Sequence, residues 1–148
     1  MKIFLAIPFS QFCNNTEEEL IENRWFFLEL INKVKELGLD YFLAHEREEW
    51  GAKYVSAKES TVIDYDAMQS SDLIVAIPGN PISGGVHMEL GWATSLRKKI
   101  LIFLDKSHEY SPMIEGACGL TDVKYFYYDE MISKELINLI VDNLKKEI

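Results

Sequence analysis

The sequence predicts a doubly wound, Rossmann-like α/β fold, in which helices cover both faces of a five-stranded, mainly parallel sheet. Two observations predict this fold class. Five short apolar segments with the length of buried strands alternate with segments whose apolar residues recur at helical spacing. Strands separated by helices pair in parallel, and helices then cover both faces of the sheet. A length of 148 residues allows one well-buried core, so we expect a single domain over residues 1–148.

The N-terminal part of the chain predicts a strand, a helix and a second strand. Residues 2–7 form an apolar strand that stops before a proline. Thr16 with Glu19 three residues later is a capping box, and the helix that it begins ends at Gly38. Residues 41–44 are a short second strand. The apolar positions of the helix are Leu20, Ile21, Trp25, Leu28, Ile31 and Val34.

The central part repeats this alternation. Ser56 and Glu59 form a second capping box, which begins a helix that runs to about Met68. Residues 73–77 are an unbroken apolar run typical of a strand buried on both faces. The prolines and glycines of residues 78–85 exclude regular structure and predict a loop. Apolar residues then recur at helical spacing: Val86, Leu90 and Ala93.

The C-terminal part completes the predicted sheet. Residues 100–104 and 123–128 are the fourth and fifth strands. Residues 111–117 between them form a short helix with a proline at its first position. Residues 133–146 form an amphipathic helix.

Composition and charge exclude several classes of partner. The net charge of −9 disfavours binding to nucleic acid or to an anionic membrane surface. Cys13 and Cys118 have no metal-ligand spacing, so we expect two reduced thiols and no metal site. The N-terminus has no signal-peptide pattern, and no apolar run has the length of a membrane span. We therefore expect a cytoplasmic protein.

Three segments of unusual composition follow the first three strands. They are residues 8–13, 45–52 and 78–85. Because ligands of doubly wound sheets bind at the carboxyl ends of the strands, these segments are expected to converge on one site.

Glu89 is the first candidate for chemistry. It falls among the apolar positions of its helix, three residues after Val86 and four before Ala93, just after a glycine-rich loop. A carboxylate in a partly desolvated cleft can act as a nucleophile or stabilise a cationic centre. The alternative is a boundary glutamate that turns outward.

Asp66 is the candidate second acid. It lies near the C-terminal end of the preceding helix, where the helix dipole disfavours a carboxylate. Asp64 competes with it from another side of the same helix, and a solvated helix-end aspartate is the alternative reading. Paired carboxylates break glycosidic C–O or C–N bonds through an oxocarbenium-like transition state.

The loops offer further binding residues. Ser83 and Gly85 precede a helix N-terminus, where N–H groups and a hydroxyl can hold a phosphate, although a turn with an N-cap would show the same pattern. His87 is equally a ligand or a surface residue. The remaining candidates could contact a base or phosphate, or be ordinary loop and core residues: Phe9, His45, Arg47 and Trp50.

Several segments together resemble one family of enzymes. The segments are Pro8-Phe9-Ser10-Gln11, residues 44–52 with the pattern Ala-His-x-Arg-Glu-x-Trp-Gly-Ala, residues 64–66, residues 71–72, Pro78-Gly79-Asn80-Pro81 and residues 85–93. They resemble the nucleoside 2-deoxyribosyltransferase superfamily, and specifically its nucleoside 5′-monophosphate N-glycosidases, such as the CMP and hydroxymethyl-CMP hydrolases of mildiomycin- and blasticidin-type pathways.

The resemblance implies roles for individual residues. Glu89 matches the catalytic glutamate, Asp66 the acid that assists the leaving base, and Ser83 and Gly85 the phosphate loop. Ser111 matches a serine that reaches the phosphate in the neighbouring subunit, which implies a homodimer. The resemblance also implies a nucleoside 2-deoxyribosyltransferase-like domain over the whole chain.

The chain departs from the family pattern in the first loop. Ser10 stands where the hydrolases carry an arginine, and Arg47 is the residue that could compensate. Ser83 favours the nucleotide-hydrolysing branch, because the classical transferases carry an aspartate at that position.

From these residues we expect an N-glycosidase that hydrolyses a pyrimidine nucleoside 5′-monophosphate, CMP or a 5-modified CMP, without cofactor or metal. Ser10, Ser83, Gly85 and the partner's Ser111 would hold the sugar phosphate. A deoxyribosyltransferase that exchanges bases is the first alternative. A non-catalytic nucleotide sensor is the alternative from another class.

Overall fold

The computed structural model describes residues 1–9, 17–53 and 55–148. A five-stranded sheet has the order β2-β1-β3-β4-β5, and every neighbouring pair is parallel. The predicted doubly wound fold is therefore confirmed. The strands are β1 (Lys2–Ala6), β2 (Asp40–Phe42), β3 (Leu73–Ala76), β4 (Lys99–Asp105) and β5 (Val123–Tyr128). The helices are α2 (Glu17–Glu36), α3 (Ala44–Arg47), α4 (Ala57–Ser70), α5 (Gly84–Ser95), α6 (Pro112–Glu115) and α7 (Lys134–Leu144), with 3₁₀ turns η1 (Glu49–Gly51) and η2 (Gly116–Gly119).

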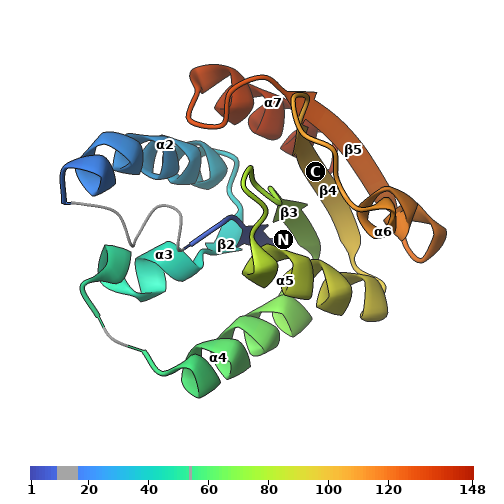
Figure 1. Cartoon of the computed structure of the whole chain (residues 1–148), viewed down its shortest axis with the longest axis horizontal. Helices are drawn as coiled ribbons and strands as arrows, with labels where there is room; N and C mark the ends of the chain where they lie inside the picture. Colours follow the sequence, from blue (N-terminus) through green and yellow to red (C-terminus); the bar gives the residue numbers. More distant parts are fainter. Residues whose placement is uncertain (10–16, 54) are drawn as a thin grey trace.

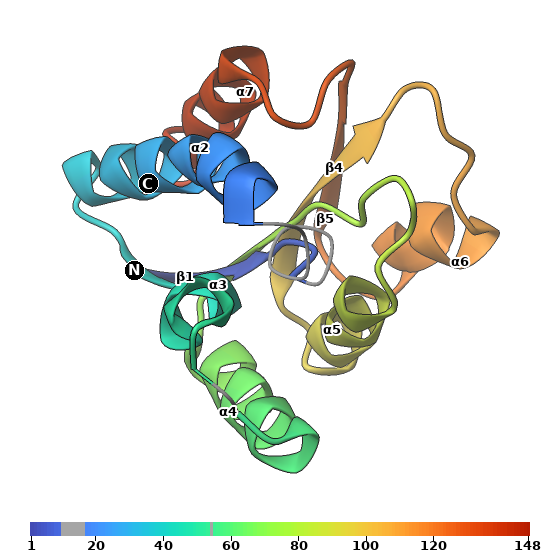
Figure 2. The same cartoon turned by 60° about the vertical axis from the view of Figure 1, so that its left-hand side comes forward.

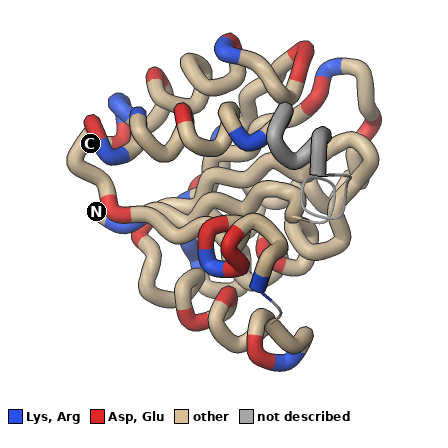
Figure 3. The backbone as a smooth tube through the Cα atoms, turned by 90° about the vertical axis from the view of Figure 1, so that its left-hand side faces the viewer, with Lys and Arg blue, Asp and Glu red and all other residues tan. Residues whose placement is uncertain are grey.

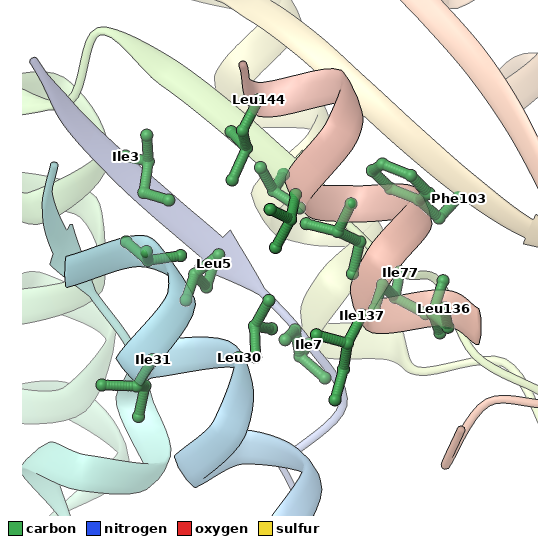
Figure 4. Packing of buried hydrophobic residues seen from close by; sticks show 14 of the residues in the cluster. Ile3, Leu5, Ile7, Leu30, Ile31, Ile77, Phe103, Leu136, Ile137 and Leu144 are labelled. Atoms are coloured by element: carbon green, nitrogen blue, oxygen red, sulfur yellow. The ribbon is translucent and has the colours of Figure 1, made fainter. Parts of the chain in front are cut away.

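Helices cover both faces of the sheet, as Figures 1 and 2 show. On one face, α2 and α7 pack side chains such as Leu30 and Ile137 over β1, β3 and β4 (Figure 4). On the other face, α4 and α5 bury Met68 and Leu90 against the same strands. In Figure 3 the central strands are almost entirely tan, which means that they carry few charged residues. Both of their faces are buried.

Local sequence signals explain several element boundaries. Ser56 begins α4 by accepting a hydrogen bond from Glu59 N at 3.2 Å, which confirms the N-cap. Gly38 follows α2 with a φ of 72°, a conformation that glycine adopts without strain. The capping box at Thr16 lies outside the described residues. No helix in the described ranges is long and apolar enough to cross a membrane.

Two sequence expectations differ from the structure. The sequence predicted no regular element for residues 45–52, but α3 and η1 make most of this segment helical. In α2, Trp25 and Leu28 were placed on the apolar face, yet they are 37% and 43% exposed, and Phe26 and Phe27 are buried in their place. The buried face of α2 therefore consists of Phe26, Phe27, Leu30, Ile31 and Val34, which pack in the core between the helix and the sheet.

The strand order places a topological switch point beside β1. The chain goes from β1 to β2 on one side of it and returns to β3 on the other. The connections therefore diverge at the carboxyl ends of β1 and β3 and leave a crevice there, which is where doubly wound proteins bind ligands.

Candidate functional site

A cavity of about 220 Å³ lies at this switch point. The ends of β1 and β2 supply one side of it, and the helices α4 and α5 supply the other. The segments that the sequence expected to converge therefore do so. The lining residues are Leu5, Ile7, Phe9, Ala44, Arg47, Glu48, Ser60, Asp64, Ser83, Gly85, Val86 and Glu89.

Glu89 lies in the second turn of α5 and faces the cavity. Its helix neighbours Val86 and Leu90 are 2% and 3% exposed, so the carboxyl group sits beside apolar surface. The pKa of Glu89 is raised to about 8: burial is the largest cause, the charge of Asp64 adds to the shift, and Arg47 opposes it. A perturbed carboxyl group in a cleft is typical of a functional site.

Asp64 is the second acid in the cavity wall. It projects from α4 and makes an ion pair with Arg47, whose Nη1 donates to Asp64 Oδ1. Burial raises the pKa of Asp64, and the contact with Arg47 counteracts this shift. Asp64, Glu89 and Arg47 thus place two carboxyl groups and one guanidinium group in the wall of the same cavity.

The structure does not place Asp66 in the cavity. The side chain of Asp66 is exposed, because two residues along an α-helix correspond to a rotation of about 200°. The residue that the sequence analysis chose as the second acid therefore faces away from Glu89, and its competitor Asp64 occupies the position.

Arg47, on α3, makes ion pairs with acidic side chains of the cavity wall. Besides Asp64, it contacts Glu48 Oε1 through Nη2 at 2.5 Å and the carbonyl oxygen of Ser60 through Nη1 at 3.4 Å. Its terminal nitrogens therefore already have partners within the protein. Arg47 is therefore arranged to neutralise the charge of neighbouring carboxylates. This arrangement does not fit the expectation that Arg47 replaces a phosphate-binding arginine.

Ser83 and Gly85 lie at the start of α5, on the edge of the cavity. Ser83 is the N-cap, and its Oγ accepts a hydrogen bond from Val86 N at 3.3 Å. The first N–H groups of a helix have no partner within the helix and favour an anion. The phosphate loop implied by the sequence is therefore placed next to Glu89.

The aromatic candidates divide into one that lines the cavity and two that lie behind it. Phe9 lines the cavity. His45 is 0% exposed, packs on Phe27 with 4.5 Å between ring centroids, and donates from Nε2 to Pro8 O at 3.1 Å. Burial lowers the pKa of His45 to about 4, so it is a neutral core residue beneath Phe9. Trp50 packs on the other side of this cluster, 5.8 Å from Phe27 and beneath Arg24.

His45 and Trp50 are thus not among the residues that line the cavity in the described part of the chain. The sequence analysis proposed that both contact the substrate. The structure corrects the placement of His45, because its ring is fully enclosed by aromatic side chains.

Two further candidates, His87 and Ser111, do not line the cavity. His87 donates from Nδ1 to Ser83 O at 2.9 Å and lines a separate cavity of about 300 Å³ between α5 and α6. Ser111 is the N-cap of α6, and its Oγ accepts from Met113 N at 3.2 Å. A contribution of Ser111 to the cavity requires a second subunit and stays a prediction. Ser10 lies outside the described residues.

Comparison with known proteins places this geometry in a family. No family model and no curated protein sequence matches the chain. Among solved structures, BlsM is 33% identical over 95% of this chain and 85% of its own, with a TM-score of 0.74. The Clostridium botulinum CMP N-glycosidase BcmB is 26% identical over 100% of both chains, with a TM-score of 0.72.

The chain belongs to the nucleoside 2-deoxyribosyltransferase superfamily. Within it, the chain falls in the branch of the CMP hydrolases. The fold is also that of a 2-desoxiribosyltransferase from Leishmania mexicana, which is 20% identical over 95% of this chain and 97% of its own, with a TM-score of 0.52.

In this member of the superfamily, two polar lining residues were not predicted from the sequence, Glu48 and Ser60. Glu48 was part of a charged segment whose side chains could not be assigned to one face without the helical turn of α3. Ser60 enters the site through its backbone carbonyl, which no side-chain pattern reveals. The complete arrangement can attack an electrophilic carbon with one carboxylate and move a proton with another.

Proposed function

We propose that the protein is an N-glycosidase that hydrolyses a pyrimidine nucleoside 5′-monophosphate, CMP or a 5-modified CMP. The products are the free base and ribose 5-phosphate or its 2-deoxy form. The observation that carries the proposal is the presence of Glu89 and Asp64 in one cavity at the switch point. The similarity to a CMP N-glycosidase over the full length of both chains supports the substrate class.

Glu89 is the nucleophile in this proposal. Its carboxylate attacks C1′ of the sugar, the bond between C1′ and the base nitrogen breaks, and the bonding electron pair leaves with the base. The apolar neighbours of Glu89 limit its hydration, which makes an ionised carboxylate there more reactive toward a cationic centre.

Asp64 supplies the proton that the departing base requires. Burial raises the pKa of Asp64, and in the reactive form we assign to Asp64 the one proton that the pair of acids retains. After the proton has left, Arg47 stabilises the carboxylate through the ion pair that it makes with Asp64. Arg47 therefore stabilises the charge that develops during the first step.

Water completes the second step. Asp64, now ionised, accepts a proton from a water molecule, whose oxygen attacks C1′ of the glycosyl ester. The bond between C1′ and Glu89 breaks and restores the Glu89 carboxylate. The sum of both steps is substrate plus water to base plus sugar 5-phosphate.

The cavity has two ends that suit the two halves of the nucleotide. Ser83 and Gly85 are proposed to bind the sugar phosphate at the start of α5, together with Ser10 and the partner's Ser111. Phe9 offers an aromatic face to the base. Glu48, which also lines the cavity, offers a carboxylate to the amino edge of the base.

The test is a panel of nucleoside 5′-monophosphates and nucleosides, each scored for released base by liquid chromatography. We expect free cytosine from CMP with the wild-type protein and none with Glu89→Gln. Glu130→Gln, at an exposed position, is the matched control and should keep full activity. Release of no base from any compound would contradict the proposal, and binding without release would indicate a sensor.

A second base added to the same reaction separates hydrolysis from transfer. We expect ribose 5-phosphate to form at the same rate with and without the second base. If the exchanged nucleotide forms faster than the free sugar phosphate, the protein is a transferase.

A further inference from the structure

A buried tyrosine connects the loops that follow β3 and β4. Tyr110 is 9% exposed, and its hydroxyl donates to the carbonyl oxygen of Gly79 at 3.2 Å. The hydroxyl oxygen of Tyr110 in turn accepts a hydrogen bond from Asp105 N, at the end of β4, at 3.1 Å. The Tyr110 hydroxyl is thus held both as a donor and as an acceptor. It links Gly79, in the loop after β3, to the end of β4.

Tyr110 holds the loop at the position where its backbone turns. Gly79 there has a φ of 88°, a conformation that glycine adopts without strain. Pro78, just before it, accepts a hydrogen bond from Ser83 N at 2.9 Å and so closes the loop into a compact turn. Holding Gly79 therefore fixes the direction in which the loop approaches Ser83.

The same loop ends in the proposed phosphate-binding residues. Ser83 caps α5 and lines the cavity, and Gly85 lies beside it. Ser83 can offer its hydroxyl and Gly85 its backbone N–H, since the Ser83 N–H is already donated to Pro78 O. The direction of both groups follows the path of the loop, so a displaced loop would misalign them together. The reacting groups have other supports: Asp64 and Arg47 belong to α4 and α3. Glu89 lies in the second turn of α5, which is anchored by the buried side chains of Val86 and Leu90.

A second group of contacts secures the β4 side of the link. Asp105 accepts hydrogen bonds from Ser107 N at 2.8 Å and Ser107 Oγ at 2.7 Å, and from Asn80 Nδ2 in the β3 loop at 3.4 Å. Burial raises the pKa of Asp105, but these hydrogen bonds outweigh burial and lower it overall. The ring of His108 packs edge-on against Tyr110 at 4.9 Å.

We propose that Tyr110 is a positioning residue, whose hydroxyl holds the β3 loop so that Ser83 and Gly85 bind the sugar phosphate of the substrate. The inference rests on the proposed function, because it assigns the phosphate end of the same cavity. It adds a residue that lies outside the cavity and acts through Gly79 (Figure 1 shows the loop between β3 and α5).

The experiment compares Tyr110→Phe with Tyr127→Phe, whose side chain is 57% exposed on β5. Both substitutions remove one hydroxyl and keep the ring, and thermal unfolding checks that both variants are folded. With CMP as substrate, we expect Tyr110→Phe to raise KM about five- to tenfold and to change kcat less than twofold, from the loss of one fixing hydrogen bond. Tyr127→Phe should match the wild type.

Cytidine, which has no phosphate, distinguishes positioning from general damage. Its kcat/KM should be the same in Tyr110→Phe and in the wild type, because Glu89 and Asp64 keep their places. An equal loss for CMP and cytidine, or a loss in kcat without a change in KM, would overturn the proposal.

Titration calorimetry with ribose 5-phosphate tests the inference without turnover. We expect Tyr110→Phe to bind it about five- to tenfold more weakly than the wild type. Equal affinity, or no binding to either protein, would overturn the inference even if base release is observed. Weaker binding by the variant without base release from the wild type would contradict the proposed hydrolysis and leave the positioning role supported.

Discussion

Asp64 and Glu89 line one cavity although different helices carry them, and only Asp64 is paired with Arg47. The two acids are therefore electrostatically different. Asp64 loses its proton next to a guanidinium, whereas Glu89 must ionise beside apolar side chains and another acid. Two carboxyl groups whose surroundings shift their pKa values differently can take different roles, here a proton carrier and a nucleophile.

The first prediction compares two aspartates of α4. Asp64→Asn removes the acid of the cavity, and we expect kcat/KM for CMP to fall by about 100-fold or more. Asp66→Asn changes an exposed residue on the same helix and should stay within about twofold of the wild type. Steady-state kinetics of base release measure both. A larger loss for Asp66→Asn than for Asp64→Asn would restore Asp66 as the catalytic acid.

The second prediction concerns the pH dependence of activity. The reactive form has Glu89 ionised and Asp64 protonated, and the last proton of this pair leaves at about pH 8, the pKa of Glu89. We expect kcat/KM to be nearly level just below that value and to fall about tenfold per pH unit above it, because Asp64 then has no proton to donate. Measurements between about pH 6.5 and 9.5 avoid the second ionisation of the substrate phosphate near pH 6. A profile that stays flat or rises above pH 8 would contradict the role of Asp64 as the acid or the raised pKa of Glu89.

The third prediction concerns stability. Folding raises the pKa of Glu89 from 4.5 to about 8, so the folded state binds the proton more tightly than the unfolded state. The free energy of unfolding must then decrease as the pH rises from about 4.5 to about 8. Glu89→Gln is neutral at every pH, and we expect it to be more stable than the wild type by up to about 4 kcal/mol at pH 8.5.

Chemical denaturation at pH 5 and pH 8.5 measures this difference. At pH 5 the two proteins should unfold at nearly the same denaturant concentration, and Glu130→Gln should follow the wild type at both values. If Glu89→Gln is less stable than the wild type at pH 8.5, the carboxylate is stabilised in the fold and the proposed environment of Glu89 is wrong.

The sequence predicted much of this site because the relevant signals are local. The apolar run of β3 and the cap at Ser56 each depend on residues within a few positions, and the structure has both. Glu89, Ser83 and Gly85 could be found because a glycine loop between a buried strand and a helix defines the carboxyl edge of a parallel sheet.

What the sequence did not reveal depends on how distant elements pack. Asp64 and Asp66 are indistinguishable until the rotation of α4 against the sheet is known, since either could face the cavity. His45 lies in a charged segment and is buried only because Phe27 and Phe9 enclose it. Glu49 and Trp50 have φ values of 47° and 59°, a conformation rare outside glycine that no propensity predicts.

The fourth prediction removes the cation of the cavity. Arg47→Met leaves Asp64 and Glu48 without their partner, and we expect a loss of stability of about 1–3 kcal/mol. Arg47 also lowers the pKa of Glu89, so the inflection of the pH profile should move to higher pH in the variant. The double variant Arg47→Met/Asp64→Asn should recover part of the stability, because it leaves fewer uncompensated carboxylates. An inflection that stays in place or moves to lower pH would contradict the electrostatic role of Arg47.

The fifth prediction tests whether Ser111 acts across a subunit interface. Within one chain Ser111 caps α6 and does not line the cavity, so a role at the phosphate requires a second copy. We expect Ser111→Ala to raise KM for CMP about five- to tenfold and Glu89→Ala to be inactive. In an equimolar mixture that has exchanged subunits, half of the dimers are mixed, and each of these holds one site with both residues intact. About a quarter of all sites should then show the wild-type KM, by the symmetry of a two-fold dimer. If Ser111 acted within its own chain, or if the protein were a monomer, mixing would restore no site with the wild-type KM.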